Sequence, residues 1–292
     1  MKELVIVSGK GGTGKTSVAA SLAVLATNSI MADCDVDAPN LHLLLAPEIK
    51  SSEEFIEAKI AVIDPKLCTN CGICETVCKF DAITPKFQVE PILCEGCGVC
   101  FISCPADAIE MKERLSGYIY TSETNCGPMA HALLLAGESN SGKLVTRVRQ
   151  LATKLAQQYE KDLIIIDGPP GIACAAISAI TGASAGLVVT EPTVAAIHDL
   201  ERILELFQHF MIPVMVLINK SDLNNSKTSQ IKDYCAQKGI PIVGELVYDT
   251  IMYKAVIEGQ PIVKYAPTNK LAKALEMIWK KIEHQLEATN DK

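Results

Sequence analysis

The chain has 292 residues, of which 49% are apolar and 21% are charged, and its formal net charge is −7. This acidic balance argues against nucleic acid as the main partner. The length and composition are typical of a globular protein with one large α/β domain, alone or with a smaller insert.

The chain opens on MKELVIVSGK, which predicts a strand at once and leaves no room for a signal peptide. No apolar run along the sequence reaches the ~18 residues that a membrane span requires. We therefore expect a cytoplasmic protein.

Residues 1–58 are predicted to form the first part of a P-loop domain. The strand ELVIVSG is followed by a glycine-rich loop, the helix KTSVAASLAVLA and the short strand SIMAD. The loop GKGGTGKT, residues 9–16, fits the pattern G-x-x-x-x-G-K-[ST] and has the strand and helix that this pattern requires on either side. Its glycines let backbone N–H groups turn toward phosphate oxygens, and the helix N-terminus adds partial positive charge.

Within this loop, Lys15 is expected to neutralise the charge of the β- and γ-phosphates, and Thr16 Oγ1 is expected to bind Mg²⁺. The predicted nucleotide contacts are Gly9, Gly11, Gly12, Thr13, Gly14, Lys15, Thr16 and Ser17. Lys10 is one lysine more than such a loop needs, and its plainest interpretation is an exposed loop residue.

Three acidic residues alternate in MADCDVDAPN, residues 31–40, directly after the second predicted strand. Alternate residues of an extended segment face the same way, so Asp33, Asp35 and Asp37 can point toward one site. Neighbouring carboxylates repel each other unless a metal or polar contacts compensate them, and Mg²⁺ would do so. We expect Asp35 to orient the attacking water and Asp33 to support the Mg²⁺ site, and we interpret Asp37 as a turn residue.

Residues 59–112 are rich in cysteine and contain an internal repeat, and we interpret them as an inserted domain. The two runs of cysteines are Cys68-x₂-Cys71-x₂-Cys74-x₃-Cys78 and Cys94-x₂-Cys97-x₂-Cys100-x₃-Cys104. In a reducing compartment, thiolates at this spacing are metal ligands rather than disulfide partners. Zinc is the competing metal, but it would leave the third and fourth cysteines of each run without a function.

The spacing resembles that of bacterial ferredoxins with two [4Fe–4S] clusters, in which the fourth cysteine of each run binds the other run's cluster. The resemblance implies one cluster on Cys68, Cys71, Cys74 and Cys104, and a second on Cys94, Cys97, Cys100 and Cys78. Lys79 follows Cys78 where a proline follows Cys104, a departure that alters local geometry without removing a ligand. The solitary cysteines are expected to be small buried residues: Cys34, Cys126, Cys174 and Cys235.

Residues 113–292 return to α/β alternation and are predicted to be the remainder of the P-loop domain. The apolar strands LIIID, GLVVT and PVMVLIN alternate with helical stretches such as VAAIHDLERILELFQHF. This pattern predicts a mostly parallel sheet with helices on both faces. The predicted fold class is therefore an α/β P-loop domain interrupted by a small α+β insert of the ferredoxin type.

Three segments of this zone are candidates for the nucleotide site. LIIIDGPPG, residues 163–171, predicts a buried strand whose Asp167 reaches the Mg²⁺ through water, with an ordinary strand-end cap as the alternative. INKSD, residues 218–222, fits N-K-x-D, a pattern associated with guanine, in which Asp222 would accept from the base. TEPT, residues 190–193, either lines the site or forms a loop.

The last helical stretch, KLAKALEMIWKKIEHQLE, has an apolar face formed by Leu271, Leu275, Ile278, Ile282 and Leu286. Packing of this face on the domain is the simpler interpretation. Membrane binding is predicted only as an alternative, and only through this helix.

GKGGTGKT, DCDVDAPN and LIIIDGPPG together resemble the MinD/ParA branch of P-loop ATPases, which includes Mrp-type proteins and the nitrogenase iron protein. The resemblance covers nearly all of the chain outside the insert, and it implies ATP and Mg²⁺ as cofactors. It implies that Lys10 crosses the interface of a homodimer in the ATP state to contact phosphates held by the partner subunit. It also implies that Asn219 contacts the purine, and it favours ATP over GTP.

The combined pattern resembles MinD-superfamily ATPases that carry an inserted ferredoxin domain. It predicts an ATP hydrolase with Lys10, Lys15, Asp35 and Asp167 as catalytic groups, coupled to electron transfer through two clusters to an unidentified redox protein. One alternative is a carrier that passes Fe–S clusters to apoproteins, although the C-terminal C-x-x-C of Mrp-type relatives is missing. The other is a positioning ATPase of the division or partition type, whose clusters act as sensors.

Overall fold

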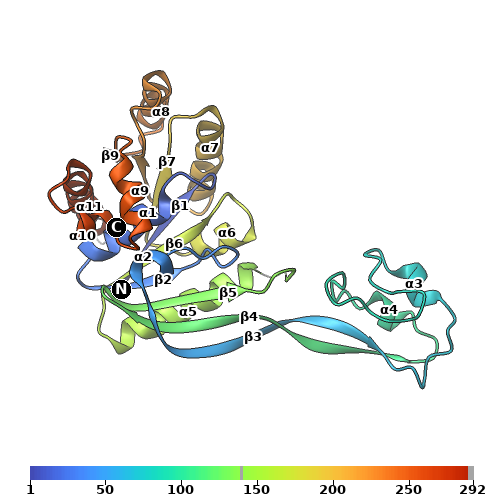
Figure 1. The fold of residues 1–292 in the computed structure, drawn as a ribbon. Coiled ribbons are helices and arrows are strands. Elements are labelled where there is room, and N and C mark those ends of the chain that lie inside the picture. Colours follow the sequence, from blue (N-terminus) through green and yellow to red (C-terminus); the bar gives the residue numbers. More distant parts are fainter. Residues whose placement is uncertain (139–140, 289–292) are drawn as a thin grey trace. The chain divides into compact units, whose positions relative to one another are not determined.

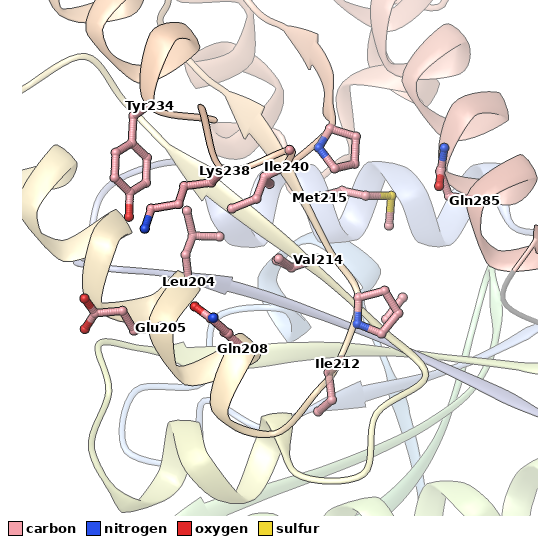
Figure 2. A pocket seen from close by; sticks show the side chains of 14 residues that line it. Leu204, Glu205, Gln208, Ile212, Val214, Met215, Tyr234, Lys238, Ile240 and Gln285 are labelled. Carbon is pink, nitrogen blue, oxygen red and sulfur yellow. The ribbon is translucent and has the colours of Figure 1, made fainter. Parts of the chain in front are cut away.

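A computed structural model describes residues 1–138 and 141–288 of the chain. Its internal contacts define two compact units, which Figure 1 shows as ribbons. Unit 1 comprises residues 1–52, 119–133 and 141–292, and unit 2 comprises residues 53–118 and 134–140.

Two long strands, β3 (Glu48–Ile63) and β4 (Ile109–Thr124), each belong partly to unit 1 and partly to unit 2. The predicted limits of the insert, 58/59 and 112/113, therefore fall inside strands and differ from the limits of unit 2. The change in composition does not mark the ends of these strands, because β3 and β4 are hydrogen-bonded neighbours that continue past it.

Seven further strands complete the sheet of the described residues: β1 (Lys2–Ser8), β2 (Ser29–Asp33), β5 (Gly127–Leu134), β6 (Leu163–Pro170), β7 (Ala185–Thr190), β8 (Val214–Ile218) and β9 (Ile242–Glu245). The strand order is β3-β4-β5-β2-β6-β1-β7-β8-β9. The pairings from β5 through β2, β6, β1, β7 and β8 to β9 are parallel. The predicted mostly parallel α/β sheet is confirmed.

The helices of unit 1 are α1 (Lys15–Leu25), α2 (His42–Leu45), α5 (Ser141–Gln158), α6 (Cys174–Ile180), α7 (Val194–His209), α8 (Asn225–Gln237), α9 (Thr250–Ile257), α10 (Ile262–Tyr265) and α11 (Lys270–Ala288). On one face of the sheet, Leu4 and Ile6 of β1 share a buried core with α1 and α11. Val5 and Val7 point to the other face, where α5, α6 and α7 contact the strands. Burial of consecutive residues on both faces explains why the strands are continuously apolar.

The apolar face of α11 is buried in this core, which confirms the packing interpretation of the last helix. Among the described residues, no helix combines the length and the apolar character needed to cross a membrane.

Unit 2 contains two short helices, α3 (Ile73–Val77) and α4 (Val99–Ile102), in contact with each other. Each helix follows a glycine in the left-handed region, Gly72 with φ 78° and Gly98 with φ 76°. A small apolar core lies beneath them and includes Ala61, Ala82, Ile83, Ile109 and several cysteines. The internal repeat of the sequence thus corresponds to two similar turn-and-helix segments.

Candidate functional site

The glycine-rich loop connects the end of β1 at Ser8 with the start of α1 at Lys15. Gly12 and Gly14 have φ of +80° and +88°, a region that glycine enters without steric cost. Gly9 is required for a different reason, because a Cβ there would lie 2.3 Å from Asp199 Cβ on α7. The strand, loop and helix predicted for phosphate binding are therefore all present.

Four charged residues expected at the site form one cluster at the carboxyl end of the strands: Lys15, Asp33, Asp35 and Asp167. Asp33 ends β2 in register with Asp167 on β6, so two neighbouring parallel strands bring both carboxylates to the same edge. Lys15 Nζ lies 2.6 Å from Asp167 Oδ1 and 3.9 Å from Asp35 Oδ2. The structure thus brings the predicted catalytic lysine and all three carboxylates together.

Lys15 is the cation that compensates these acids. Burial alone lowers its pKa, but the carboxylates of Asp167, Asp35 and Asp33 raise the pKa above its ordinary value. Lys15 is therefore charged at neutral pH, and its Nζ also lies 3.3 Å from Thr16 Oγ1.

Both carboxylate oxygens of Asp33 accept hydrogen bonds from the backbone of the following loop. Its Oδ1 accepts from Asp35 N at 3.1 Å, and its Oδ2 accepts from Leu41 N at 3.2 Å. Burial, and then the neighbouring charge of Asp167, raise its pKa to about 8. Asp33 therefore positions the segment that carries Asp35, and its support of Mg²⁺ stays a prediction.

Asp167 has an unused acceptor at the centre of the site. Its Oδ2 is buried and has no hydrogen-bond partner among the described residues. Lys15 Nζ contacts both this carboxylate, 2.6 Å from Asp167 Oδ1, and the Thr16 hydroxyl, 3.3 Å from its Oγ1. A carboxylate and a hydroxyl are oxygen donors that Mg²⁺ takes, completed by water and phosphate. The residues present therefore fit the predicted metal.

Lys10 lies beside Glu191, a residue that the sequence left undecided within TEPT. Lys10 Nζ lies 2.6 Å from Glu191 Oε1, and Lys220 Nζ lies 2.8 Å from Glu191 Oε2. Lys220 Nζ also donates to the carbonyl of Gly12 at 2.8 Å. Burial raises the pKa of Glu191, but its contacts with Lys10 and Lys220 have the larger combined effect and lower it. Glu191 thus lines the phosphate loop, and its position directly after β7 was the available signal.

Asn219 holds the phosphate loop through a hydrogen bond to its backbone. Its Nδ2 donates to Thr13 O at 2.7 Å, and the side chain is buried. Asp222, the last residue of the N-K-x-D pattern, accepts from Tyr248 N at 2.6 Å through Oδ1. The predicted contact of Asn219 with a purine stays a prediction.

The eight cysteines of unit 2 line two separate cavities. One cavity is lined by Cys68, Cys71, Cys74 and Cys104, and the other by Cys94, Cys97, Cys100 and Cys78. In each set, three cysteines come from one run and the fourth comes from the other run. These are the two groupings that the spacing implied.

The surroundings of the two sets repeat each other. Ala82 N donates to Cys78 Sγ at 3.4 Å, and Ala108 N donates to Cys104 Sγ at 3.3 Å. Both cavities also include residues of the same apolar core. Apolar surroundings and N–H donors to sulfur are features that tune the potential of an iron–sulfur cluster.

No three His, Cys, Asp or Glu side chains within residues 1–138 and 141–288 are arranged to hold a single metal ion. A [4Fe–4S] cube differs from a single ion because each of its four thiolates binds a separate iron around a larger body. The cysteine donor set fits such a cube in number and chemistry.

Of the solitary cysteines, Cys34 and Cys235 are buried as expected, and Cys126 is half-buried. The expectation for Cys174 is wrong because it is exposed at the start of α6.

Comparison with known proteins decides the family. Residues 4–262 match the CobQ/CobB/MinD/ParA nucleotide binding domain. The chain belongs to this family. It is 41% identical over 226 residues to the uncharacterized protein MJ0578 of Methanocaldococcus jannaschii, covering 76% of this chain and 79% of that protein.

Two solved structures of MinD proteins share the fold. The cell division ATPase MinD of Pyrococcus furiosus has a TM-score of 0.61 and 22% identity, covering 97% of this chain and 99% of that one. The septum site-determining protein MinD of Pyrococcus horikoshii, complexed with Mg-ADP, has a TM-score of 0.61 and 20% identity, covering 99% and 98%. The predicted MinD/ParA membership and P-loop fold are thus confirmed.

Proposed function

We propose that this MinD/ParA-type protein is a Mg²⁺-dependent, homodimeric ATP hydrolase that couples its nucleotide state to electron transfer through unit 2. The observation that carries the hydrolase part is the ion pair of Lys15 with Asp167, 2.6 Å long, beside the phosphate loop. The electron-transfer part depends on the two sets of four cysteines in unit 2.

The charged cluster accounts for the chemistry of hydrolysis. Lys15 would neutralise the charge of a bound triphosphate, while Thr16 directly and Asp167 through water would hold the Mg²⁺ that comes with it. Asp35 is partly exposed and orients the attacking water. Positioning and charge neutralisation then supply most of the rate. The Mg-ADP complex of the Pyrococcus horikoshii MinD supports this assignment of ligand and metal.

The proposal of a dimer rests on Lys10. In the dimer its ammonium reaches the phosphates held by the partner subunit. To do so it must leave Glu191, which holds it at 2.6 Å. Dimerisation therefore exchanges one anionic partner of Lys10 for another.

Two [4Fe–4S] clusters fit the cysteine sets described above. When bound, such a cluster takes up and gives back one electron. The chain's own contribution is four thiolates per set, N–H donors from Ala82 and Ala108, and an apolar core that limits water. A redox protein as partner and a cytoplasmic location stay predictions.

Coupling between nucleotide and unit 2 is supported by the chain path. Asp33 is in register with His131 on β5, and β5 is the strand after which the chain enters unit 2 again at residue 134. Movement of the Asp33–Asp35 segment therefore acts on a strand that leads directly into unit 2.

The experiment is anaerobic purification of the full chain, followed by iron and sulfide analysis and light scattering with Mg²⁺ and ATP. The expected result is two [4Fe–4S] clusters per chain and an ATP-dependent dimer that Lys10→Ala abolishes. Cys174→Ala is the matched control, because it removes an exposed cysteine outside the two sets. A colourless, iron-free protein contradicts the electron-transfer part, and an unaltered Lys10→Ala variant contradicts the dimer.

A positioning ATPase is the second candidate, and the comparisons favour this part of it, whereas clusters that act as redox sensors stay a prediction. The two solved MinD structures described above are of a cell division ATPase and a septum site-determining protein. ATP-dependent binding to liposomes or DNA would support this function. The third candidate, a carrier of Fe–S clusters, is distinguished from both by a transfer assay. A carrier would pass a cluster to an apoprotein while the chain keeps its own clusters.

A further inference from the structure

We infer that Arg114 makes the two cysteine sets electrostatically unequal and raises the reduction potential of the cluster held by Cys94, Cys97, Cys100 and Cys78. The inference rests on the proposed binding of two clusters by unit 2. It goes beyond that proposal because it assigns a direction to electron flow within the unit.

Arg114 is fixed against the backbone of the second cysteine run. Its Nη1 donates to Pro91 O at 2.6 Å and to Cys94 O at 3.3 Å. The side chain is 17% exposed, so its charge is only weakly screened by water. A permanent cation is thus held at the first ligand of one set.

The repeat shows that the first run has no such cation at the equivalent position. The two runs align Cys68 with Cys94, Ala82 with Ala108 and, at the same offset, Gln88 with Arg114. Gln88 carries no charge, and Arg114 is the only arginine in the sequence of unit 2.

Glu138 is the counter-ion of Arg114. The Nε of Arg114 lies 2.8 Å from Glu138 Oε1, and Nη2 lies 3.1 Å from Oε2. The guanidinium therefore lies between the Glu138 carboxylate and the backbone of residues 91–94. The positive member of this ion pair is the one that contacts the cysteine run. Lys79 and Glu95 also adjoin this set, but they are exposed and of opposite sign.

A cation near a cluster stabilises the form that carries one more electron. Uptake of that electron, from a low-potential one-electron donor, adds one negative charge and involves no bond cleavage. Net charge and hydrogen bonds around a cluster are known determinants of its potential. Arg114 therefore favours the passage of electrons from the Cys68 set to the Cys94 set.

The test is a redox titration of the full chain, followed by electron paramagnetic resonance, in variants that change one charge at a time. Arg114→Gln leaves the carboxylate alone and should lower one of the two potentials. Glu138→Gln leaves the cation alone and should raise the same potential. The expected change is about tenfold in the one-electron reduction equilibrium, or about 59 mV, in opposite directions.

Two controls separate charge from structure. Arg114→Lys keeps the cation and should restore most of the wild-type potential. Lys112→Gln removes a cation from the same strand, but its side chain is 54% exposed, so both potentials should stay unchanged. Cys71→Ala removes a ligand of the other set, so the shift in potential caused by Arg114→Gln should persist in that background. Cys97→Ala removes a ligand of the set beside Arg114, so the shift should disappear there.

Opposite shifts of a single potential support the inference. Equal movement of both potentials, no movement, or shifts of the same sign in Arg114→Gln and Glu138→Gln overturn it while leaving the clusters in place. Failure of the proposed function is a different result, since the wild-type chain then contains no clusters to titrate.

Discussion

Lys10 and Glu191 form an ion pair 2.6 Å long between the phosphate loop and the residue that follows β7. The carboxylate is shared with Lys220, so Glu191 holds two cations at once. This arrangement fixes the shape of the loop, and it also keeps Lys10 within its own subunit.

Glu191→Gln is expected to have two opposite effects. Loss of the carboxylate weakens two charged contacts and should lower the free energy of unfolding by about 1–2 kcal/mol. Lys10 is then released more easily, so dimerisation should require about tenfold less ATP. Urea unfolding and light scattering across an ATP series measure the two effects. An unchanged ATP dependence would show that Glu191 does not compete with the dimer interface; Glu205→Gln, exposed on α7, is the control.

The Lys15–Asp167 pair predicts a large loss of stability when one partner is removed. Lys15→Ala leaves the buried Asp167 beside Asp33 and Asp35 without a cation, which should cost about 3–5 kcal/mol. The double variant Lys15→Ala, Asp167→Asn should be less destabilised than Lys15→Ala, because one buried charge is removed with its partner.

Trp279 makes this measurement specific. It is the chain's only tryptophan and is buried in the core that α11 shares with β1 and α1. Its fluorescence during urea unfolding therefore reports on unit 1. A loss below about 1 kcal/mol in Lys15→Ala would contradict the expected cost of an unpaired buried carboxylate.

Asp33 predicts a dependence of stability on pH. Burial and the charge of Asp167 raise its pKa from 3.8 to about 8, so the folded chain keeps a proton there that the unfolded chain has released. The stability contributed by this group is complete below the unfolded pKa and is lost as the pH rises toward the folded pKa. Asp33→Asn should flatten that slope, as measured by Trp279 fluorescence in urea between these two pKa values. Asp37→Asn, in the exposed part of the same loop, should retain it, and a slope shared by Asp33→Asn and the wild type would refute the assignment.

Sequence patterns predicted those parts of the site that depend on neighbouring residues of the chain. The glycine spacing of residues 9–14 and the apolar strands before Ser8, Asp33 and Asp167 are set by backbone conformation and burial, so they can be read from the sequence. The cysteine spacing likewise indicated which residues line a common cavity.

Contacts between distant segments could not be predicted in this way. Glu191 meets Lys10 and Lys220 because β7 and β8 end beside the loop, a relationship that depends on strand order. The insert limits at 58/59 and 112/113 fall inside β3 and β4 for a similar reason, since the pairing of the two strands, rather than local composition, determines where each strand ends. The exposure of Cys174 depends on which side of α6 faces the protein, and a single cysteine gives no signal of that.

Base preference can be tested through Asn219 and Asp222. Asn219→Ala removes the donor to Thr13 O and leaves that carbonyl unpaired under the loop, which should weaken nucleotide binding by about 1–2 kcal/mol. Asp222 uses Oδ1 to accept from Tyr248 N, so it serves the adjacent loop and Asp222→Ala should leave the ratio of ATP to GTP affinity unchanged. Competition of ATP and GTP against a fluorescent ATP analogue measures both variants. A selective loss of GTP binding in Asp222→Ala would instead identify Asp222 as a reader of guanine and make the N-K-x-D pattern functional. Guanine offers that carboxylate two adjacent donors, N1–H and N2–H, whereas the N1 of adenine is an acceptor.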